Sequence, residues 1–363
     1  MLPLHGMPRR PPASIMLTVL ALAVAACNRV EEPISERRPA ASSPSAASRA
    51  SASASEAPIA TTEPPVPPLA APAQLLTLAS SAYQASLFAD DEAIELLTST
   101  AAYRLQIGQE PLERSLDLGF GATVTRRSYV YWSHGAIWSE PRRAAKPGGS
   151  TQLLTLAERP QRFVADIRAD EFAFLTRSAD DRYALYKVEN RRAKKLYASP
   201  GTIDALTLIG GALYFVERPD SVGWRIARVQ LAGGEPTFTA RKTGRWPANL
   251  SGTKNVVYYD GGRRDVLALT LDLREERTLA KDFICSPLAA AANVYCSTME
   301  GVFEVPPAGN PRRVVPLSRN LITSLAVNGA RLAFITDVGG QGRDGLALNV
   351  VPLGSSSGAE PAR

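Results

Sequence analysis

Few residues of this sequence fall into the sets that enzymes use for catalysis. The chain of 363 residues contains two histidines, His5 and His134, and three cysteines. Histidine supplies many zinc ligands and the general base of hydrolytic triads, so its scarcity disfavours both kinds of site. The sequence also lacks a phosphate-binding GxxxxGKS/T loop, an HExxH pair and a CxxC pair. We therefore expect no catalytic residue, no metal and no cofactor, and we interpret the protein as a non-enzyme.

Paired acids are the next candidates for chemistry, because two neighbouring carboxylates can act as general acid and base. Such pairs occur at Asp90–Asp91, Asp180–Asp181 and Glu275–Glu276, all at predicted turns. Aspartate commonly caps backbone groups in turns, and we favour that structural role. The segment GGQGRDGLA at 339–347 matches the calcium-binding nonapeptide of RTX repeats, but such a site needs stacked repeats and the motif occurs once. We interpret it as a glycine-rich turn.

Binding residues are better represented than catalytic ones. Tryptophan and arginine are the residues most enriched in protein-binding hot spots, and the segment GRWPAN at 244–249 places both side by side in a predicted loop. Other arginines and the second histidine fall in loops that we expect at the same end of the fold. The candidate partner-binding residues are Trp246, Arg245, His134, Arg218, Arg263 and Arg343.

The first cysteine lies in a segment typical of export. Arg9 and Arg10 precede an apolar run of twelve residues, 15–26, which is shorter than the roughly 20 residues needed to span a bilayer. Such a basic and then apolar segment is typical of a secretion signal. Val24-Ala25-Ala26-Cys27 also resembles the bacterial lipobox, and this resemblance implies cleavage before Cys27 and diacylglyceryl attachment to its sulfur. Two or three acyl chains would form a stable membrane anchor.

The segment after Cys27 has the composition of a tether. Residues 27–73 are rich in Pro, Ala and Ser, and no aromatic residue precedes Tyr83. A segment with so little apolar surface is expected to remain disordered. In lipoproteins of many Gram-negative bacteria an Asp after the cysteine favours the inner membrane, and the residue here is Asn28, so we expect the outer membrane rather than the inner one. We divide the chain into a signal peptide (1–26), a lipidated tether (27–73), a folded domain (74–353) and a disordered tail (354–363).

The net charge gives little support for nucleic-acid binding. The chain carries +6 in total, and without Arg9 and Arg10 the remainder has 39 basic and 35 acidic residues, or +4. This excess is small and scattered, whereas nucleic-acid binding proteins concentrate basic residues on one face. We expect a monomer whose partners are the membrane, through its lipid, and an envelope protein or glycan.

The elements that position these residues recur along the folded domain. Short β-branched and aromatic runs alternate with turn residues, which indicates strands. Seven such runs align, and their central positions are spaced by 36, 42, 41, 44, 37 and 38 residues. A period near forty with about four strands is typical of a β-propeller blade. The aligned positions are Leu96, Trp132, Phe174, Phe215, Tyr259, Cys296 and Phe334.

The ends of the repeat array predict how the ring closes. The last repeat supplies three strands and is followed by GSSSGAEPAR, which does not read as a strand. The segment QLLTLA at 74–79 repeats QLLTLA at 152–157, the predicted outer strand of the second repeat. We therefore predict an all-β fold with seven four-stranded antiparallel blades, in which the N-terminal strand completes the last blade and no sheet edge stays open.

Cys285 and Cys296 lie on two predicted adjacent strands of the sixth repeat. In an exported protein such a pair is expected to form a disulfide, and two free buried thiols are the alternative. If Cys27 carries the lipid, the lipid and the disulfide together account for all three cysteines.

The folded domain resembles the bacterial seven-bladed propeller lipoproteins, with blades loosely similar to those of TolB. The motif VYWS at 130–133 is similar to the YWTD type of blade, with His134 where that blade has an aspartate. The resemblance implies a lipid-anchored propeller in the cell envelope that binds a protein or a glycan. The alternative is a propeller enzyme, of the lyase or quinoprotein kind, with a site over the central channel.

Overall fold

The computed structural model describes residues 73–79, 85–90, 92–106, 109, 111–116, 118, 122–133, 140–145, 151–153, 160–178, 180, 182–189, 192–261, 264–317, 321–337 and 345–353. The chain divides into two units, 1–64 and 65–363, and all of these residues belong to the second. Every regular element among them is a β-strand. Within these ranges, no helix has the length and apolar character needed to cross a membrane.

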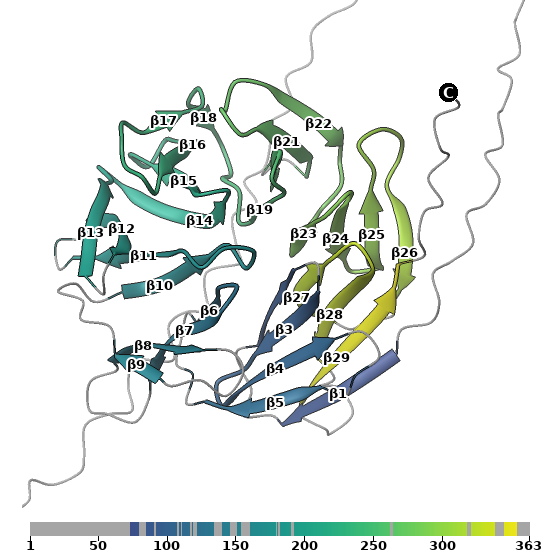
Figure 1. Ribbon diagram of the computed structural model, residues 1–363. Helices are drawn as coiled ribbons and strands as arrows, with labels where there is room; N and C mark the ends of the chain where they lie inside the picture. The colour runs from purple at the N-terminus through teal and green to yellow at the C-terminus, as the bar shows by residue number, and fades with distance from the viewer. Residues whose placement is uncertain are drawn as a thin grey trace, which may run out of the picture. The chain divides into compact units, whose positions relative to one another are not determined.

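The described strands form seven antiparallel sheets that surround a central axis as the blades of a propeller (Figure 1). In blades 1 to 6 the chain runs from an inner strand A at the axis to an outer strand D, and in blade 7 it supplies strands A to C in this order. Blade 1 contains β2 (Ser86–Ala89), β3 (Ala93–Leu97), β4 (Ala101–Gln106) and β5 (Leu112–Ser115). Blade 2 contains β6 (Thr123–Val124), β7 (Ser128–Ser133), β8 (Glu140–Ala145) and β9 (Thr151–Leu153).

Blades 3 and 4 follow in chain order. Blade 3 contains β10 (Pro160–Ala165), β11 (Phe172–Arg177), β12 (Tyr183–Glu189) and β13 (Arg192–Ala198). Blade 4 contains β14 (Thr202–Ile209), β15 (Ala212–Arg218), β16 (Gly223–Gln230), β17 (Thr237–Phe238) and β18 (Lys242–Thr243). Both β17 and β18 pair with β16, so two short strands together make the outer edge of blade 4.

The remaining three blades return the chain to its starting point. Blade 5 contains β19 (Leu250–Gly252), β20 (Val256–Asp260), β21 (Val266–Thr270) and β22 (Glu276–Ala280). Blade 6 contains β23 (Leu288–Ala290), β24 (Val294–Thr298), β25 (Gly301–Val305) and β26 (Arg312–Pro316). Blade 7 contains β27 (Ile322–Val327), β28 (Arg331–Asp337), β29 (Gly345–Pro352) and β1 (Ala73–Ala79).

The strand register confirms the repeat alignment made from the sequence. In six of the seven blades the aligned residue of strand B pairs directly with a large apolar residue of strand A. The pairs are Leu96↔Leu87, Phe174↔Phe163, Phe215↔Leu206, Tyr259↔Leu250, Cys296↔Leu288 and Phe334↔Leu325. All twelve side chains except Leu250 are buried, and full burial of such a side chain contributes roughly 1.5–3 kcal/mol. The positions that recur along the sequence are therefore positions of the hydrophobic core.

The hydrophobic core consists of seven clusters, and each cluster lies between two neighbouring blades. The cluster between blades 4 and 5, for example, packs Tyr214 and Trp224 against Val257 and Tyr259. The ring closes on itself because another cluster joins blade 7 to blade 1 through Ala333, Ile335, Ile94 and Leu96. Each blade is thus stabilised by its neighbours rather than by a core of its own.

The first strand closes the last blade, as predicted. β1 pairs antiparallel with β29, from Ala73 opposite Val350 to Ala79 opposite Gly345, with one irregularity between Gln74 and Leu76. The blade order is therefore β1-β29-β28-β27. Figure 1 shows the purple first strand beside the yellow last strand. Without β1, the backbone groups of β29 would form an open edge.

Buried glutamates add polar contacts to this apolar framework. The Glu95 side chain is fully buried, and Nη1 of Arg104 donates a hydrogen bond to its Oε1 at 2.5 Å. The hydroxyl of Tyr129, in the neighbouring blade, donates to Oε2 of the same carboxylate at 3.0 Å. A buried carboxylate is stable only when its oxygens are hydrogen-bonded, and Glu95 meets this condition.

The same kind of contact recurs in blade 4. The carboxylate of Glu217 accepts hydrogen bonds from Arg225 Nε at 2.8 Å, from Ser199 Oγ at 2.6 Å and from the hydroxyl of Tyr197. Tyr197 and Ser199 belong to the end of blade 3, so this glutamate also joins two blades. In blade 6, Glu304 accepts from Tyr295 and Arg312. Glu276, which the sequence placed in a turn, instead lies in β22 and contacts Tyr259 and Lys242.

The predicted disulfide is present. Cys285 and Cys296 are bonded, with 4.9 Å between their Cα atoms. Cys296 lies on β24 as expected, but Cys285 lies in the loop before β23 rather than on a strand. The disulfide therefore ties the loop that leads into blade 6 to the second strand of that blade.

Candidate interaction face

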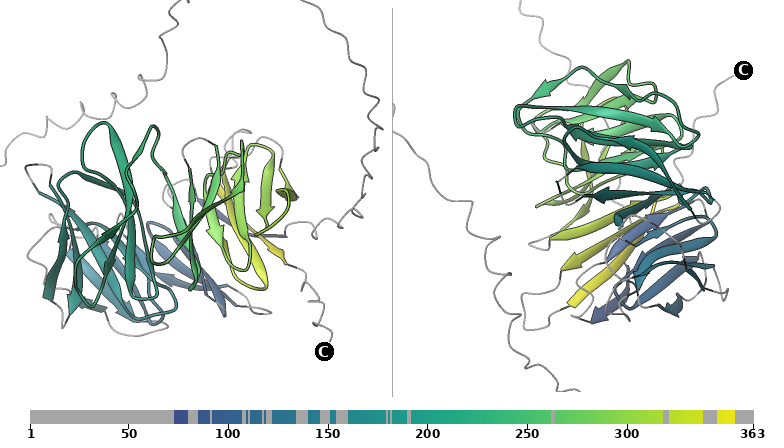
Figure 2. Two further views of the ribbon diagram at one scale, coloured as in Figure 1. Left: turned by 90° about the horizontal axis from the view of Figure 1, so that it is seen from above. Right: turned by 90° about the vertical axis from the view of Figure 1, so that its left-hand side faces the viewer.

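The loops of the ring gather at its two ends (Figure 2). One end carries the turns between strands B and C together with the loops from strand D to the next strand A, and we call it the D–A face. It includes the loops 199–201, 219–222, 244–249, 281–287 and 299–300. The other end carries the A-to-B and C-to-D turns. All six predicted partner-binding residues belong by sequence to loops or strand ends of the D–A face.

The loop that carries Trp246 is held in place from both sides. It begins after β18 and ends at β19. Oδ1 of Asp260 accepts hydrogen bonds from the backbone N–H groups of Ala248, at 2.9 Å, and Asn249, at 3.1 Å. The side-chain amide of Asn249 donates to Oγ of Ser286 at 3.0 Å. These contacts connect the loop to blades 5 and 6, so Trp246 stands on a positioned loop.

Arg218 and Trp246 form the centre of the candidate site. The guanidinium carbon of Arg218 lies 3.9 Å from the centroid of the Trp246 ring, within the range of a cation–π contact, which contributes about 0.5–1 kcal/mol at exposed sites. Arg218 Nε also donates to Oδ2 of Asp204 at 2.5 Å. Asp204 thereby fixes the direction of the guanidinium, and Trp246 remains 41% exposed.

Arg245 is exposed next to Trp246 and acts electrostatically on Asp260. Burial raises the pKa of the Asp260 carboxyl above its ordinary value, and the two backbone N–H groups and the Arg245 charge oppose this rise. Because Asp260 is engaged by the backbone of the Trp246 loop, we interpret it as the anchor of that loop rather than as a proton donor for a reaction.

Exposed apolar side chains also gather on the D–A face. Six large hydrophobic residues of the described chain are exposed, and five of them lie in loops of this face, on blades 4 to 7. They are Val222 at 68%, Trp246 at 41%, Ile284 at 57%, Met299 at 93% and Leu321 at 68% exposure. The sixth, Leu112, begins β5 at the opposite end of the ring. Apolar side chains that protrude together on one face are typical of protein interaction sites.

The structure brings together three of the six predicted residues. Arg218 contacts Trp246, and Arg245 is its chain neighbour. His134, Arg263 and Arg343 lie outside the described residues. The sequence analysis missed Val222, Ile284, Met299 and Leu321. A signal was available, because turns are usually formed by Gly, Asp, Asn and Ser, and a large apolar residue in a predicted turn has no core to pack into.

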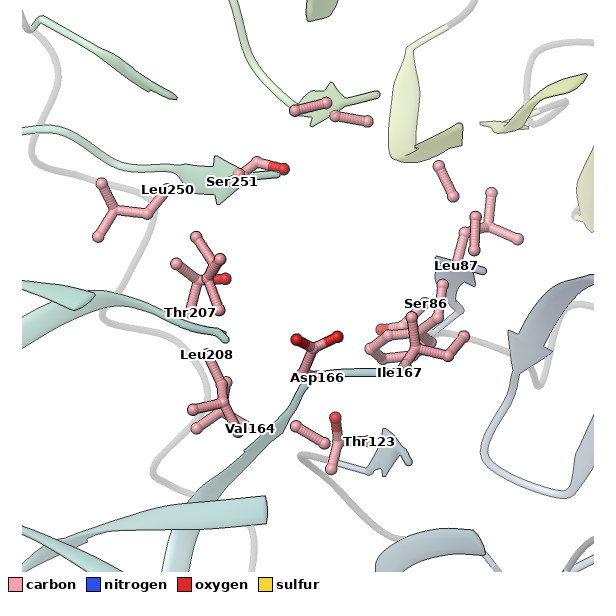
Figure 3. Close-up of a pocket in the computed structure, with 18 of the residues that line it drawn as sticks. Ser86, Leu87, Thr123, Val164, Asp166, Ile167, Thr207, Leu208, Leu250 and Ser251 are labelled. Atoms are coloured by element: carbon pink, nitrogen blue, oxygen red, sulfur yellow. The ribbon is translucent and has the colours of Figure 1, made fainter. Parts of the chain in front are cut away.

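The central channel contains a cavity of about 370 Å³ that is lined by the inner strands of all seven blades. In Figure 3, Asp166, the residue that follows β10, points into this space, and Thr123, Thr207 and Ser251 lie around it. Most other lining residues are apolar. Across the part of the chain that the structure describes, no group of three His, Cys, Asp or Glu side chains is placed to hold a metal ion.

Comparisons with known proteins identify the fold. No family model matches the chain, and no curated protein matches its sequence. Among solved structures, YCF48 from Cyanidioschyzon merolae has a TM-score of 0.56 at 13% identity, covering 77% of this chain and 98% of that one. An oligogalacturonate lyase in complex with manganese has a TM-score of 0.52 at 12% identity, covering 76% and 90%. A putative TolB from Agrobacterium tumefaciens has a TM-score of 0.43 at 15% identity, covering 58% and 85%. At these identities the likeness concerns the fold alone, and the chain is a β-propeller.

Proposed function

We propose that the protein is a lipid-anchored propeller of the bacterial cell envelope that binds a protein partner through its D–A face and catalyses no reaction. The apolar arc on that face carries this proposal: Val222, Trp246, Ile284, Met299 and Leu321 are exposed on loops of four consecutive blades. These side chains expose apolar surface to water. Burial of that surface against a partner would be favourable by about 25 cal/mol per Å². A binding face accounts for their presence.

A protein fits this face better than a glycan. Four of the five exposed residues are aliphatic or Met side chains without hydrogen-bonding groups, and such side chains complement the apolar core of a protein interface. Trp246 with Arg218 stacked on it combines the two residue types most typical of hot spots. Sugars would require several hydrogen-bond donors and acceptors beside an aromatic ring, and the exposed arc offers one aromatic ring.

The anchor and the location belong to the same proposal. Cys27, at the end of the lipobox-like segment, would carry the acyl chains, and the segment 28–73 would hold the propeller away from the headgroups. Asn28 after the cysteine supports the outer membrane. Incorporation of a labelled fatty acid into the full chain, lost on Cys27→Ser, tests the lipidation.

Site-specific photocrosslinking tests the binding face. A photoreactive phenylalanine analogue is placed at Met299 or at Ile284, both on the D–A face, and at Leu112 as a matched exposed apolar position at the opposite end. In intact bacteria producing the full chain, we expect one discrete protein adduct from each D–A position and none from Leu112. Trp246→Ala should reduce the adduct. Equal capture at Leu112, or no adduct from either D–A position, would contradict the proposal.

A further inference from the structure

The inner strands present polar groups to the central channel and apolar side chains to the blade cores. In blade 4, Leu206 and Leu208 are buried in the core between blades 3 and 4, and Thr207 stands between them in the sequence. In blade 5, Ser251 follows Leu250, which packs against the core between blades 4 and 5. Because successive side chains of a strand point in opposite directions, the surface that remains in the channel is mostly polar.

Three hydroxyl groups that line the channel have no hydrogen-bond partner within the described chain. They belong to Thr123, Thr207 and Ser251, on the inner strands of blades 2, 4 and 5, and we call them the channel hydroxyls. Figure 3 shows their oxygens on the side of the cavity. Thr123 is only 2% exposed, and a buried hydroxyl without a partner costs free energy. Water and hydroxylated ligands can pair with such a group from within the cavity.

The carboxylate of Asp166 points into the same space (Figure 3). Its Oδ1 accepts a hydrogen bond from the backbone N–H of Arg168 at 3.0 Å, and its Oδ2 accepts one from the backbone N–H of Gly210 at 3.3 Å. A carboxylate has about four acceptor sites, so part of its capacity remains available. The two backbone contacts also fix its direction. Asp166 is therefore a positioned acceptor for the hydroxyl hydrogens of a ligand.

Charges of both signs line the cavity. Asp166 is the only acid among the described lining residues, and two exposed arginines, Arg162 and Arg168, line the cavity as well. The carboxylate disfavours an anionic ligand, and the guanidinium groups disfavour a cationic one. A neutral ligand with several hydroxyl groups is compatible with both, because a hydroxyl can donate to a carboxylate and accept from a guanidinium.

We propose that the central channel binds a neutral polyhydroxylated ligand of the size of a hexose, with Asp166 and the channel hydroxyls as its hydrogen-bonding partners. The cavity of about 370 Å³ lies within the range of about 300–1,000 Å³ for small-molecule sites. The ligand exchanges hydrogen bonds with water for bonds to groups that the fold has already positioned, which reduces the entropy lost on binding. The inference concerns the channel alone and does not depend on the partner proposed for the D–A face.

Calorimetric titration with glucose, galactose and mannose tests the site. The full chain carries Cys27→Ser, which removes the predicted lipid and the need for detergent. We expect saturable binding of one molecule per chain for at least one of these hexoses. The cationic amino sugar and the anionic uronic acid derived from that hexose should bind at least fivefold more weakly. Saturable binding of none of the three hexoses, or tighter binding of a charged derivative, would overturn the inference.

Substitutions in the channel test the contacts. Asp166→Asn and Thr207→Val should each weaken binding of the hexose at least threefold, because each removes hydrogen-bonding capacity with little change in shape. Thr237→Val is the matched control, since Thr237 is exposed on the outer edge of blade 4 and does not line the cavity. This variant should bind as the parent chain does. Unchanged affinity in both channel variants would contradict the proposed contacts.

A thiol-protection measurement locates the hexose without a change to its proposed partners, and it covers the case in which the channel variants do not fold. In the Cys27→Ser chain, Ser86→Cys introduces one thiol beside the Cys285–Cys296 disulfide, at a position that lines the cavity. We expect the hexose to slow modification of this thiol by a small methanethiosulfonate reagent at least threefold. Met299→Cys, on the D–A face, should react equally fast with and without the hexose. Protection at Met299 alone, or at neither position, would overturn the channel site.

Discussion

The hydroxyl of Tyr129 in blade 2 donates a hydrogen bond of 3.0 Å to Oε2 of Glu95 in blade 1. Both residues are buried, and Arg104 occupies the other oxygen of the carboxylate. Tyr197 and Glu217 make the same contact between blades 3 and 4. Neighbouring blades are therefore joined by hydrogen bonds that require a protonated tyrosine as well as by apolar packing.

Alkaline pH should weaken the ring. Burial, followed by the effect of a nearby glutamate, raises the pKa of Tyr129, Tyr259 and Tyr295 above the ordinary value of 10.0. The folded state then holds these protons more tightly than the unfolded state. Their contribution to stability is complete below pH 10 and declines as the pH rises above 10. Melting temperatures measured from pH 8 to pH 11.5 should fall at the alkaline end, and Tyr129→Phe should flatten that fall. A slope unchanged by this substitution would contradict the prediction.

Reduction of the Cys285–Cys296 disulfide should destabilise blade 6. The two cysteines are 11 residues apart, and a loop of this length constrains the unfolded chain by roughly 3 kcal/mol. Chemical unfolding of Cys285→Ala/Cys296→Ala should show a loss of about 2–4 kcal/mol. Dithiothreitol should lower the stability of the wild type toward that of the variant and leave the variant unaffected.

Removal of the closing strand should open the ring. Deletion of 74–79 removes most of β1 and leaves the backbone groups of β29 unpaired. Such an edge favours association with other chains. We expect a lower melting temperature together with aggregation detected by light scattering. A deletion of equal length in the segment 40–45, outside the folded domain predicted from the sequence, serves as the control. A deletion of 74–79 that behaved like this control would show that closure does not depend on β1.

Asp204→Ala should weaken partner capture with little effect on stability. The Asp204–Arg218 pair is partly exposed, with 29% and 26% of the side chains accessible, and pairs of this kind contribute about 0–1 kcal/mol. Without Asp204, however, Arg218 is no longer held against Trp246. We expect a melting temperature within a few degrees of the wild type and a reduced crosslink yield from Met299. Full yield would mean that the fixed guanidinium is not needed for binding.

Gly301 follows the turn that displays Met299 and should resist substitution. Its φ is +136°, and a Cβ there would lie 2.0 Å from the carbonyl oxygen of Val315. Both backbone strain and a clash with backbone therefore oppose Gly301→Ala, at a cost of about 1–3 kcal/mol for the strain alone. Gly309 also has a positive φ, +104°, but its nearest neighbour would be a proline side-chain carbon at 3.8 Å. In denaturant titrations Gly301→Ala should lose clearly more stability than Gly309→Ala.

The fold was readable from the sequence because a propeller repeats its core positions. The residues aligned at intervals of 36 to 44 lie on the second strands of the blades. There they pair with large apolar residues of the inner strands. The closing strand was readable because QLLTLA occurs twice. The strand assignment of Cys285 was wrong, since β23 begins only at Leu288 and the loop before it is irregular.

The site was only partly readable, because exposure is a property of the assembled ring. The sequence indicated Trp246, Arg245 and Arg218 through their residue types, and the structure places them together. The one signal for Met299, a large apolar residue in a turn, does not say that the side chain stays exposed in the assembled ring.

The pairing of β1 with β29 brings the two ends of the described ring next to each other, with Ala73 opposite Val350. A circular permutant follows from this geometry: a short linker could join the former ends, and the chain could be opened at 199–201, between blades 3 and 4. All seven sheets would stay intact. In such a permutant the proposed tether would join the ring between blades 3 and 4 instead of at β1. This change would alter how the D–A face is oriented relative to a membrane.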